Sequence, residues 1–337
     1  MKRPGCAGCG LPRPVLASAF RVPEAIPMTI KTPLALALAA LLLAACDRAP
    51  EAPAEATAES AGAAPAADAG DPDAALRDDQ TDPLDAILVG DWRDANNTPR
   101  DAWRHPRETL DFFGVGANQD IVEISPGGGW YTEILAPLPQ EKGSYVGVVM
   151  DPDAFDDAGA RDYYAKNNQK LRDKLAARPD IYGEATLVEI DPSAPVIGEP
   201  ASADVVLTFR NVHNWVMDGD EAAMFQAFYD VLRPGGVLGV TDHRAAAGKS
   251  LDEVKETGYL PEEYVIELAT AAGFVLEEKS EINANPADTK DHPNGVWTLA
   301  PGNNHDAADS AKYAAIGESD RMTLRFVKPA TETPPAQ

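Results

Sequence analysis

Cysteine is nearly absent from this sequence of 337 residues. The only thiols are Cys6, Cys9 and Cys46, all close to the amino end, so the long remainder cannot form a disulfide or a thiolate metal site. Cys6 and Cys9 have the spacing of a redox or metal-binding pair, but no second pair completes a zinc site. We therefore assign no role to these two residues.

Positive charge is also scarce. The chain has 29 Lys and Arg residues against 54 Asp and Glu residues, which gives a formal net charge of −25. Nucleic acids and anionic lipid surfaces are polyanions and would repel such a chain, so we expect neither as a partner. We interpret the excess of acid as a source of solubility, with an acidic interaction tail as the alternative.

The apolar run at residues 34–45 is too short to span a bilayer, because it contains only twelve residues. It follows Lys31 and ends at Cys46, an arrangement typical of a signal peptide. The letters LAAC at 43–46 resemble the lipoprotein box of bacteria. This resemblance implies that Cys46 is acylated, becomes the first residue of the mature chain and anchors it to a membrane. Asp47 resembles the inner-membrane retention signal of enteric bacteria. We therefore expect the protein on the periplasmic side of the cell envelope, with the inner membrane favoured.

The first eighty residues are expected to direct and tether the chain. Residues 1–27 are long and broken by proline, unlike the start of a signal peptide, so we expect this segment to be a mis-assigned start and translation to begin at Met28. Residues 28–45 then form the signal peptide. Residues 46–80 are rich in alanine, proline and acid and contain no aromatic residue, which predicts a flexible linker.

Periodic apolar segments begin at about residue 82. We expect a helical lead-in over 81–118, one domain over 119–330 and a disordered tail over 331–337. Strands are predicted over 120–125, 144–150, 186–190, 204–209, 237–241, 274–282 and 322–327. Helices are predicted over 130–136, 163–177, 221–232 and 261–272. This alternation predicts an α/β domain with a doubly wound, mostly parallel sheet and helices on both faces.

A long polar connection, residues 283–320, separates the last two predicted strands. It contains Trp297 and Tyr313. Connections of this length are uncommon in compact domains unless they act as lids or binding loops. We expect such a role here.

The segment VEISPGGGWYTEILAP, residues 122–137, joins a strand to a helix through three glycines. Glycine lets the backbone approach a ligand closely, and the start of a helix offers free N–H groups. Glu123 lies at the strand end, where a carboxylate could accept hydrogen bonds from a ligand. Neither the dinucleotide fingerprint nor the P-loop is present. The alternative is a tight turn with a purely structural role.

The order of elements resembles that of the class I S-adenosylmethionine-dependent methyltransferases. In that family an acidic-x-Gly-x-Gly-x-Gly loop follows the first strand; Glu123, Gly127 and Gly129 match it, and Ser125 replaces the first glycine. ADVVLTFRNVHNWV resembles the fourth strand of the family and FYDVLRPGGVLGVTDHR the helix and turn that lead into the fifth. The resemblance implies a sheet of order 3-2-1-4-5-7-6, S-adenosylmethionine as the cofactor and a small-molecule substrate. The residues implied to hold the cofactor are Glu123, Ser125, Gly127, Gly128, Gly129, Asp151 and Asn211.

Asp151 departs from the family pattern. In the family an acidic residue that ends the second strand holds the ribose hydroxyls, but here Val149 stands near that place. Asp151 lies two residues further on, hence on the same face of the strand, and could still reach the ribose. Alternatively, it caps the next helix.

Two polar clusters follow neighbouring predicted strands. FRNVHNW contributes Arg210, Asn214 and Trp215 as candidate substrate residues and His213 as a candidate base; TDHR contributes Asp242 and His243 as candidate catalytic residues and Arg244 as a candidate substrate residue. Ligands of open parallel sheets bind at the carboxyl ends of the strands, so we expect the two clusters to face each other across the mouth of a cleft. Alternatively, they are hydrogen-bonded loop residues that shape the rim.

Three functions remain open from the sequence. The first is a methyltransferase in which His213 or His243 deprotonates the acceptor. The second is a non-catalytic accessory lipoprotein that keeps the fold, since an exported domain has an uncertain supply of the methyl donor. The third is a metal-dependent hydrolase using His213, Asp242 and His243, for which no ligand spacing is diagnostic; we expect no metal. The oligomeric state is left open.

Overall fold

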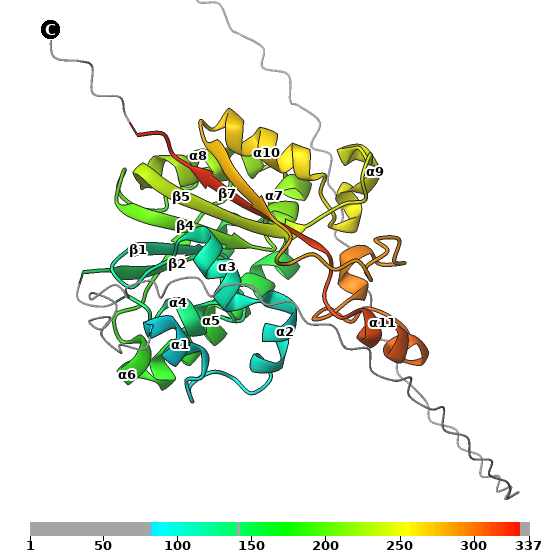
Figure 1. Cartoon of the computed structure of the whole chain (residues 1–337), viewed down its shortest axis with the longest axis horizontal. Coiled ribbons are helices and arrows are strands. Elements are labelled where there is room, and N and C mark those ends of the chain that lie inside the picture. Colours follow the sequence, from blue (N-terminus) through cyan, green and yellow to red (C-terminus); the bar gives the residue numbers. More distant parts are fainter. Residues whose placement is uncertain (1–81, 140–141, 331–337) are drawn as a thin grey trace, which may run out of the picture. The chain divides into compact units, whose positions relative to one another are not determined.

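The computed structural model describes residues 82–139 and 142–330. The expected start at Met28, signal peptide, acylated Cys46, linker and tail therefore lie outside the described residues. The centre of the domain is a seven-stranded sheet with the strand order β3-β2-β1-β4-β5-β7-β6 (Figure 1). This confirms the doubly wound α/β fold and the predicted strand order. Within the described ranges, no helix has the length and apolar character needed to cross a membrane.

All seven predicted strands are present. They are β1 Asp120–Ile124, β2 Ser144–Met150, β3 Thr186–Ile190, β4 Ala203–Phe209, β5 Leu232–His243, β6 Val275–Ser280 and β7 Arg321–Val327. β1 to β5 pair in parallel, with Val122 opposite both Val146 and Val206. β7 is antiparallel to β5 and β6, with Leu238 opposite Phe326. The carboxyl ends of β1, β4 and β5 therefore meet at one end of the sheet.

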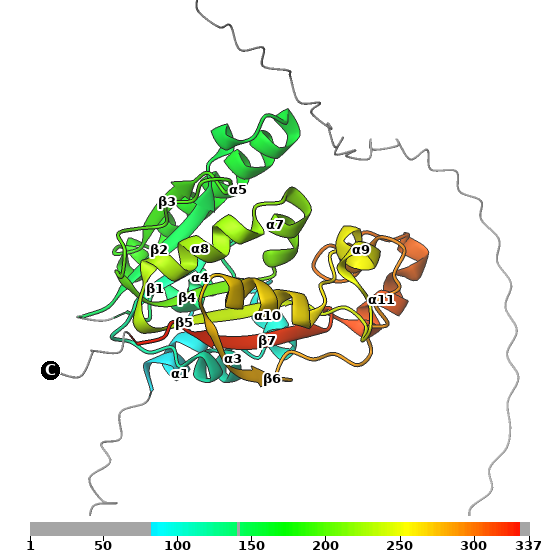
Figure 2. The same cartoon turned by 90° about the horizontal axis from the view of Figure 1, so that it is seen from above.

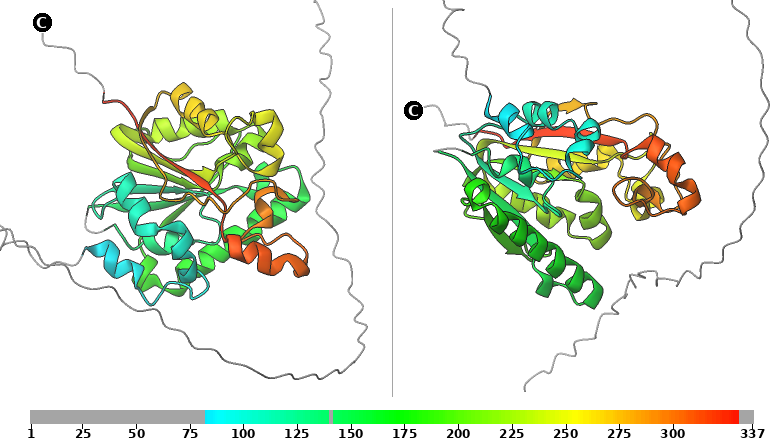
Figure 3. Two further views of the ribbon diagram at one scale, coloured as in Figure 1. Left: turned by 45° about the vertical axis from the view of Figure 1, so that its right-hand side comes forward. Right: turned by 90° about the horizontal axis from the view of Figure 1, so that it is seen from below.

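Helices connect the strands in the predicted alternation. They are α1 Pro83–Leu88, α2 Asp101–Arg104, α3 Pro106–Phe113, α4 Thr132–Leu135, α5 Ala158–Ala177, α6 Pro179–Tyr182, α7 Val212–Asp218, α8 Glu221–Val231, α9 Leu251–Val254, α10 Glu262–Ala271 and α11 Ser310–Ile316. Short 3-10 turns are η2 Thr98–Arg100, η3 Pro152–Ala154, η4 Lys255–Thr257, η5 Gly295–Thr298 and η6 Ala307–Asp309. The long helix α5 is best seen from below (Figure 3). It begins five residues before the predicted start, because Asp157 caps it by accepting a hydrogen bond from the N–H of Ala160 at 2.8 Å.

Two apolar clusters cover the two faces of the sheet. Successive side chains of a strand point to opposite faces, so on β4 Val205 and Leu207 join one cluster and Val206 joins the other. The first cluster packs against α1, α3, α4 and α5, and the second against α7, α8 and α10. Gly239 lets α3 approach β5 closely, since a Cβ there would lie 2.7 Å from Cγ of Phe113.

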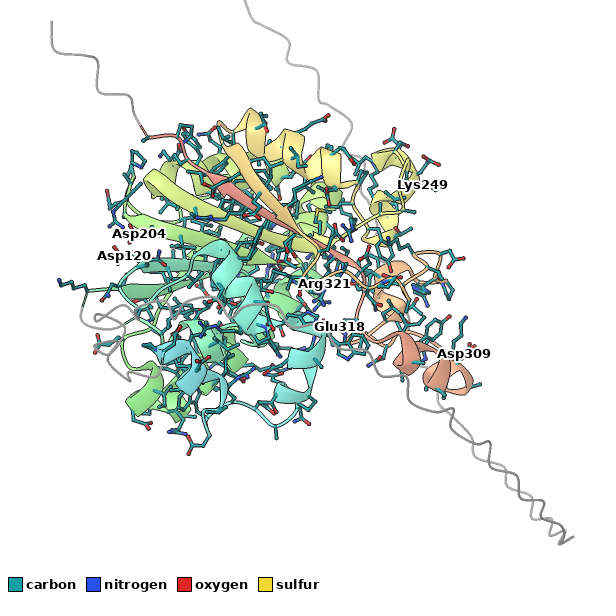
Figure 4. All side chains as sticks on the ribbon, viewed as in Figure 1. Asp120, Asp204, Lys249, Asp309, Glu318 and Arg321 are labelled. Carbon is teal, nitrogen blue, oxygen red and sulfur yellow. The ribbon has the colours of Figure 1, made fainter. Side chains whose placement is uncertain are left out.

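The two ends of the sheet differ in their polar contacts. At the amino ends of β1 and β4, Arg233 donates hydrogen bonds to Asp120 at 2.8 Å and to Asp204 at 2.7 Å. Figure 4 shows Glu318 and Arg321 close together at the opposite end. Helices α9 and α11 both lie beyond this second end (Figures 1 and 2). The segments that contain α9 and α11 therefore extend the domain at the end of the sheet where β4 and β5 have their carboxyl ends.

Candidate functional site

A cavity of about 430 Å³ lies at the carboxyl ends of β1 and β4. The loop after β1, the segment after β4, the end of β5, the lead-in before α3 and the connection before β7 all contribute to it. Its lining residues are Asn97, Arg100, Arg104, Glu123, Ile124, Ser125, Pro126, Gly127, Gly128, Trp130, Tyr131, Tyr163, Phe209, Arg210, Asn211, His213, Asn214, His243, Val296, Trp297, Pro301 and Gly302. The volume is at the lower end of the range for small-molecule sites.

The glycine loop forms one wall of this cavity. Ser125 has a φ of +51°, in the left-handed region where glycine is the usual residue, and its N–H donates to the carbonyl of Val148 at 2.8 Å. A Cβ added at Gly127 or Gly128 would meet nothing within 4 Å. At Gly129 it would lie 3.0 Å from Cδ1 of Leu171 on α5. Gly127 and Gly128 thus leave room for a ligand, whereas Gly129 serves the packing of α5 and does not line the cavity.

Glu123, at the end of β1, is hydrogen-bonded to two side chains next to the glycine loop. Its Oε2 accepts hydrogen bonds from the hydroxyl of Tyr145 at 2.6 Å and from that of Thr132 at 2.8 Å. Burial raises the pKa of this carboxyl to about 7, against the opposing effect of the two hydroxyl donors and of Lys174. One oxygen of this carboxyl, Oε2, is therefore engaged within the protein, whereas Glu123 still lines the cavity.

Asp151 takes the capping role that the sequence left open. It is the N-cap of η3, and its Oδ1 accepts the N–H of Asp153 at 2.9 Å. It does not line the cavity. Asn211, in contrast, does line it, and its side-chain amide donates to the carbonyl of Ile124 at 3.0 Å, so it ties the segment after β4 to the end of β1.

His213, Asp242 and His243 come together as predicted for the two polar clusters. His213 Nδ1 lies 2.9 Å from Oδ1 of Asp242, and because a carboxylate can only accept, this nitrogen carries the proton. His213 therefore keeps Nε2 as its free ring nitrogen. Asp242 is fully buried and also accepts the backbone N–H of His243 at 2.7 Å.

The ring of His243 lies 4.9 Å from that of His213, centroid to centroid. Its Nδ1 is 2.5 Å from Oγ of Ser319, and its Nε2 accepts from Nε of Arg210 at 3.4 Å. Burial lowers its pKa well below the ordinary value, and His213 and nearby arginines lower it further, so this ring is neutral. One ligand atom from each of His213, Asp242 and His243 lies within 4.8 Å of the others, close enough to share a metal ion, but both Nδ1 atoms and Nε2 of His243 are already hydrogen-bonded within the protein.

Two predicted substrate residues lie elsewhere. Arg244 does not line the cavity; its guanidinium pairs with Glu281 at 2.7 Å and with Asp320 at 3.0 Å. Adjacent residues of an extended chain point in opposite directions, so with His243 at the cavity Arg244 faces away. Trp215 is buried against Phe228, 5.5 Å between ring centroids. The segment we expected to be a loop is helix α7, which turns Trp215 toward the core.

Arg210 and Asn214 both line the cavity, as expected. The connection before β7 also reaches it through Val296, Trp297, Pro301 and Gly302, in keeping with the predicted binding loop. Sequence reasoning missed Arg100, Arg104, Trp130, Tyr131 and Tyr163 as lining residues. The i, i+4 spacing of Arg100 and Arg104 was a usable signal, since it places both on one side of a helical segment.

No family model matches the sequence, and no curated protein matches it. The structure is similar to that of a SAM-dependent methyltransferase from Aquifex aeolicus, with 12% identity and a TM-score of 0.43 over 73% of this chain and 98% of that one. It is similar to an S-adenosylmethionine-dependent methyltransferase from Mesorhizobium loti, with 16% identity and a TM-score of 0.41 over 67% and 96%. It is also similar to an arsenic(III) S-adenosylmethionine methyltransferase from Chlamydomonas reinhardtii, with 18% identity and a TM-score of 0.42 over 75% of this chain and 76% of that one. At such identities and scores, the fold assignment rests on the strand order of this chain.

Proposed function

We propose that the domain is an S-adenosylmethionine-dependent methyltransferase that acts on a small-molecule acceptor. One observation carries the proposal: a single cavity is lined both by an open glycine loop and by His213, whose Nδ1 is held by the buried Asp242. Both features lie at the carboxyl ends of neighbouring parallel strands, where open α/β sheets bind their ligands.

The residues present fit the cofactor at the glycine loop. Gly127 and Gly128 have no neighbour where a Cβ would stand, which leaves the backbone open to close approach. Ser125, Asn211 and Asn214 add polar groups on the same cavity. Glu123 lines the same cavity, and its Oε2 also accepts hydrogen bonds from Tyr145 and Thr132, which fixes these two residues next to the loop. When bound, S-adenosylmethionine supplies an electrophilic methyl group.

The histidines that line the same cavity suit proton removal from an acceptor. Asp242 holds the His213 proton on Nδ1, which leaves Nε2 free to accept a proton from a hydroxyl, thiol or ammonium group. Neutral His243 stands beside it without adding charge. The Trp297 ring, 6.1 Å from that of His213 between centroids, borders the same space and offers an apolar surface to the acceptor.

Substitution of the loop tests the cofactor. Gly128→Ala should leave the melting temperature unchanged, because the added methyl meets no protein atom, but it should weaken S-adenosylhomocysteine about tenfold or more by occupying ligand space. Gly116→Ala is the matched control, since its Cβ is equally unhindered and lies outside the cavity. Calorimetric titration measures the affinity of each variant for S-adenosylhomocysteine, and thermal unfolding measures its melting temperature. Absence of binding to the unaltered protein at millimolar ligand would refute the proposal.

The second candidate is a non-catalytic module that keeps the fold and binds another small molecule. The observation in its favour is that both predicted carboxylates are engaged within the protein: Asp151 caps η3 away from the cavity, and Oε2 of Glu123 accepts from Tyr145 and Thr132. The same titration separates the two functions, because only the methyltransferase requires affinity for the adenosyl ligand.

We also propose that the chain is a lipoprotein on the periplasmic side of the cell envelope, anchored through Cys46. The support is the sequence alone, the LAAC segment after a short apolar run. Metabolic labelling with an alkyne fatty acid should mark the parent and not Cys46→Ala. Equal labelling of both would remove the anchor from the proposal.

A further inference from the structure

The cavity is positively charged although the chain as a whole is strongly acidic. Three of its lining residues are arginines, Arg100, Arg104 and Arg210, and among the described residues that line it the one carboxyl belongs to Glu123. That carboxyl is buried and bonded to two hydroxyls. In a protein with a net charge of −25, three arginines at one small cavity favour the binding of a negatively charged ligand there.

Arg100 and Arg104 share a single carboxylate on the side away from the cavity. Arg100 lies 2.7 Å and Arg104 3.0 Å from the carboxylate of Glu318, which also pairs with Arg321 at 3.0 Å. Burial alone would raise the pKa of Glu318, but Arg104, Arg321, Arg210 and Arg100 outweigh it and lower the pKa to about 2. One negative charge is thus surrounded by three paired cations, which leaves an excess of positive charge.

Arg210 has no such partner. Within residues 82–139 and 142–330 no carboxylate lies within 4.0 Å of its guanidinium, and its one side-chain hydrogen bond joins Nε to His243 at 3.4 Å. Its backbone has a φ of +65°, uncommon for a residue with a side chain, and is fixed by donation of its N–H to Thr241 at 2.7 Å. Strained backbone of this kind is concentrated at functional sites. Burial lowers the pKa of Arg210 to about 10, which still leaves it charged at neutral pH.

We propose that Arg210, supported by Arg100 and Arg104, binds a carboxylate or phosphate group of the methyl acceptor, so that the acceptor is an anionic small molecule. This inference rests on the proposed function. The guanidinium fork matches both oxyanions through paired hydrogen bonds. Arg210 contacts His243, whose ring is 4.9 Å from that of His213, so the anionic group and the atom that receives the methyl group are separated by only a few bonds.

Calorimetric titration of the full chain with inorganic phosphate and with succinate tests the anion site. At least one anion should bind saturably, and Arg210→Gln should weaken it about tenfold or more, the loss expected for a charge-assisted hydrogen bond. Arg210→Lys keeps the charge without the fork and should fall between the two. Arg178→Gln is the matched control, since Arg178 pairs with Asp180 at the end of α5 and does not line the cavity; it should bind as the parent does.

The inference is overturned if neither anion binds the parent, or if Arg210→Gln binds as tightly as the parent. A parallel titration shows whether Arg210 binds the methyl acceptor or the methyl donor. It uses S-adenosylhomocysteine and 5′-methylthioadenosine, which lacks the amino-acid carboxylate. Both affinities should be unchanged in Arg210→Gln. Loss of the first with retention of the second would show that Arg210 holds the donor, and would overturn the inference. Anion binding that depends on Arg210 without any adenosyl binding would support the anion site and refute the proposed methyl transfer.

Discussion

Replacement of the buried carboxyl under the glycine loop, Glu123→Gln, should change how the stability depends on pH. Burial raises the pKa of Glu123 from 4.5 to about 7. Between these values the folded protein holds a proton that the unfolded chain releases, so the stability that this group contributes is full below pH 4.5 and is lost as the pH rises through 7. The difference corresponds to about 3 kcal/mol, since each pKa unit is worth about 1.4 kcal/mol.

Glutamine has the shape of the protonated carboxyl and cannot ionise. It can still accept the hydroxyls of Tyr145 and Thr132. Near pH 5 the variant should therefore match the parent within about 1 kcal/mol, and near pH 8 it should be the more stable by about 2 to 3 kcal/mol. Urea unfolding at the two pH values, followed by tryptophan fluorescence, measures both free energies.

Glu184→Gln serves as the control, because that side chain is exposed. Its effect should be within about 0.5 kcal/mol of zero at both pH values. A stability difference between Glu123→Gln and the parent that is the same near pH 5 and pH 8 would refute the reasoning. If Glu123 only supports the loop, affinity for S-adenosylhomocysteine should also change by less than about threefold, equivalent to about 0.7 kcal/mol.

Three further predictions concern the ion pairs, the core and the histidine pair. Glu318→Gln should destabilise the fold by about 3 to 5 kcal/mol near neutral pH, because it leaves buried arginines unpaired; the effect should fade in chemical unfolding as the pH falls from 4.5 toward 2, where the parent carboxylate becomes protonated. Gly239→Ala should cost about 1 to 3 kcal/mol in urea unfolding, because its methyl would lie 2.7 Å from Phe113; a neutral result would contradict that close approach. Asp242→Asn should remove the Nδ1–H preference of His213, seen as a change of tautomer in the ¹⁵N NMR spectrum of the imidazole; an unchanged spectrum would remove Asp242 from the positioning of His213.

The sheet and the place of the site were predictable because both depend on local patterns. Short apolar strands that alternate with helices specify a parallel sheet, and the strand ends then bring the glycine loop and His213 to one end of it. The direction of a side chain was harder to predict. Trp215 was assigned to the site because the start of α7 was missed, and Arg244 because its acidic partners come from distant segments.

The spacing of Arg100 and Arg104 indicates that they share one side of a helical segment, but neighbouring sequence does not predict that this side faces the cavity. Arg100 and Arg104 precede the sheet, and their roles depend on Glu318, 218 and 214 residues away. A helical segment with two arginines reads as an exposed face until the partner is known. The same holds for Ser319, which orients His243 across 76 residues of sequence.

The pairing of Arg100 and Arg104 with Glu318 has a consequence for how the domain forms. Residues near its start meet their carboxylate only after nearly all of the domain has been synthesised, so the cavity wall closes late and through contacts of very high sequence separation. Such contacts slow folding, because a long loop must be closed before they stabilise anything. A chain released before residue 318 could assemble the five parallel strands and yet lack the wall, which makes ligand binding a reporter of complete folding.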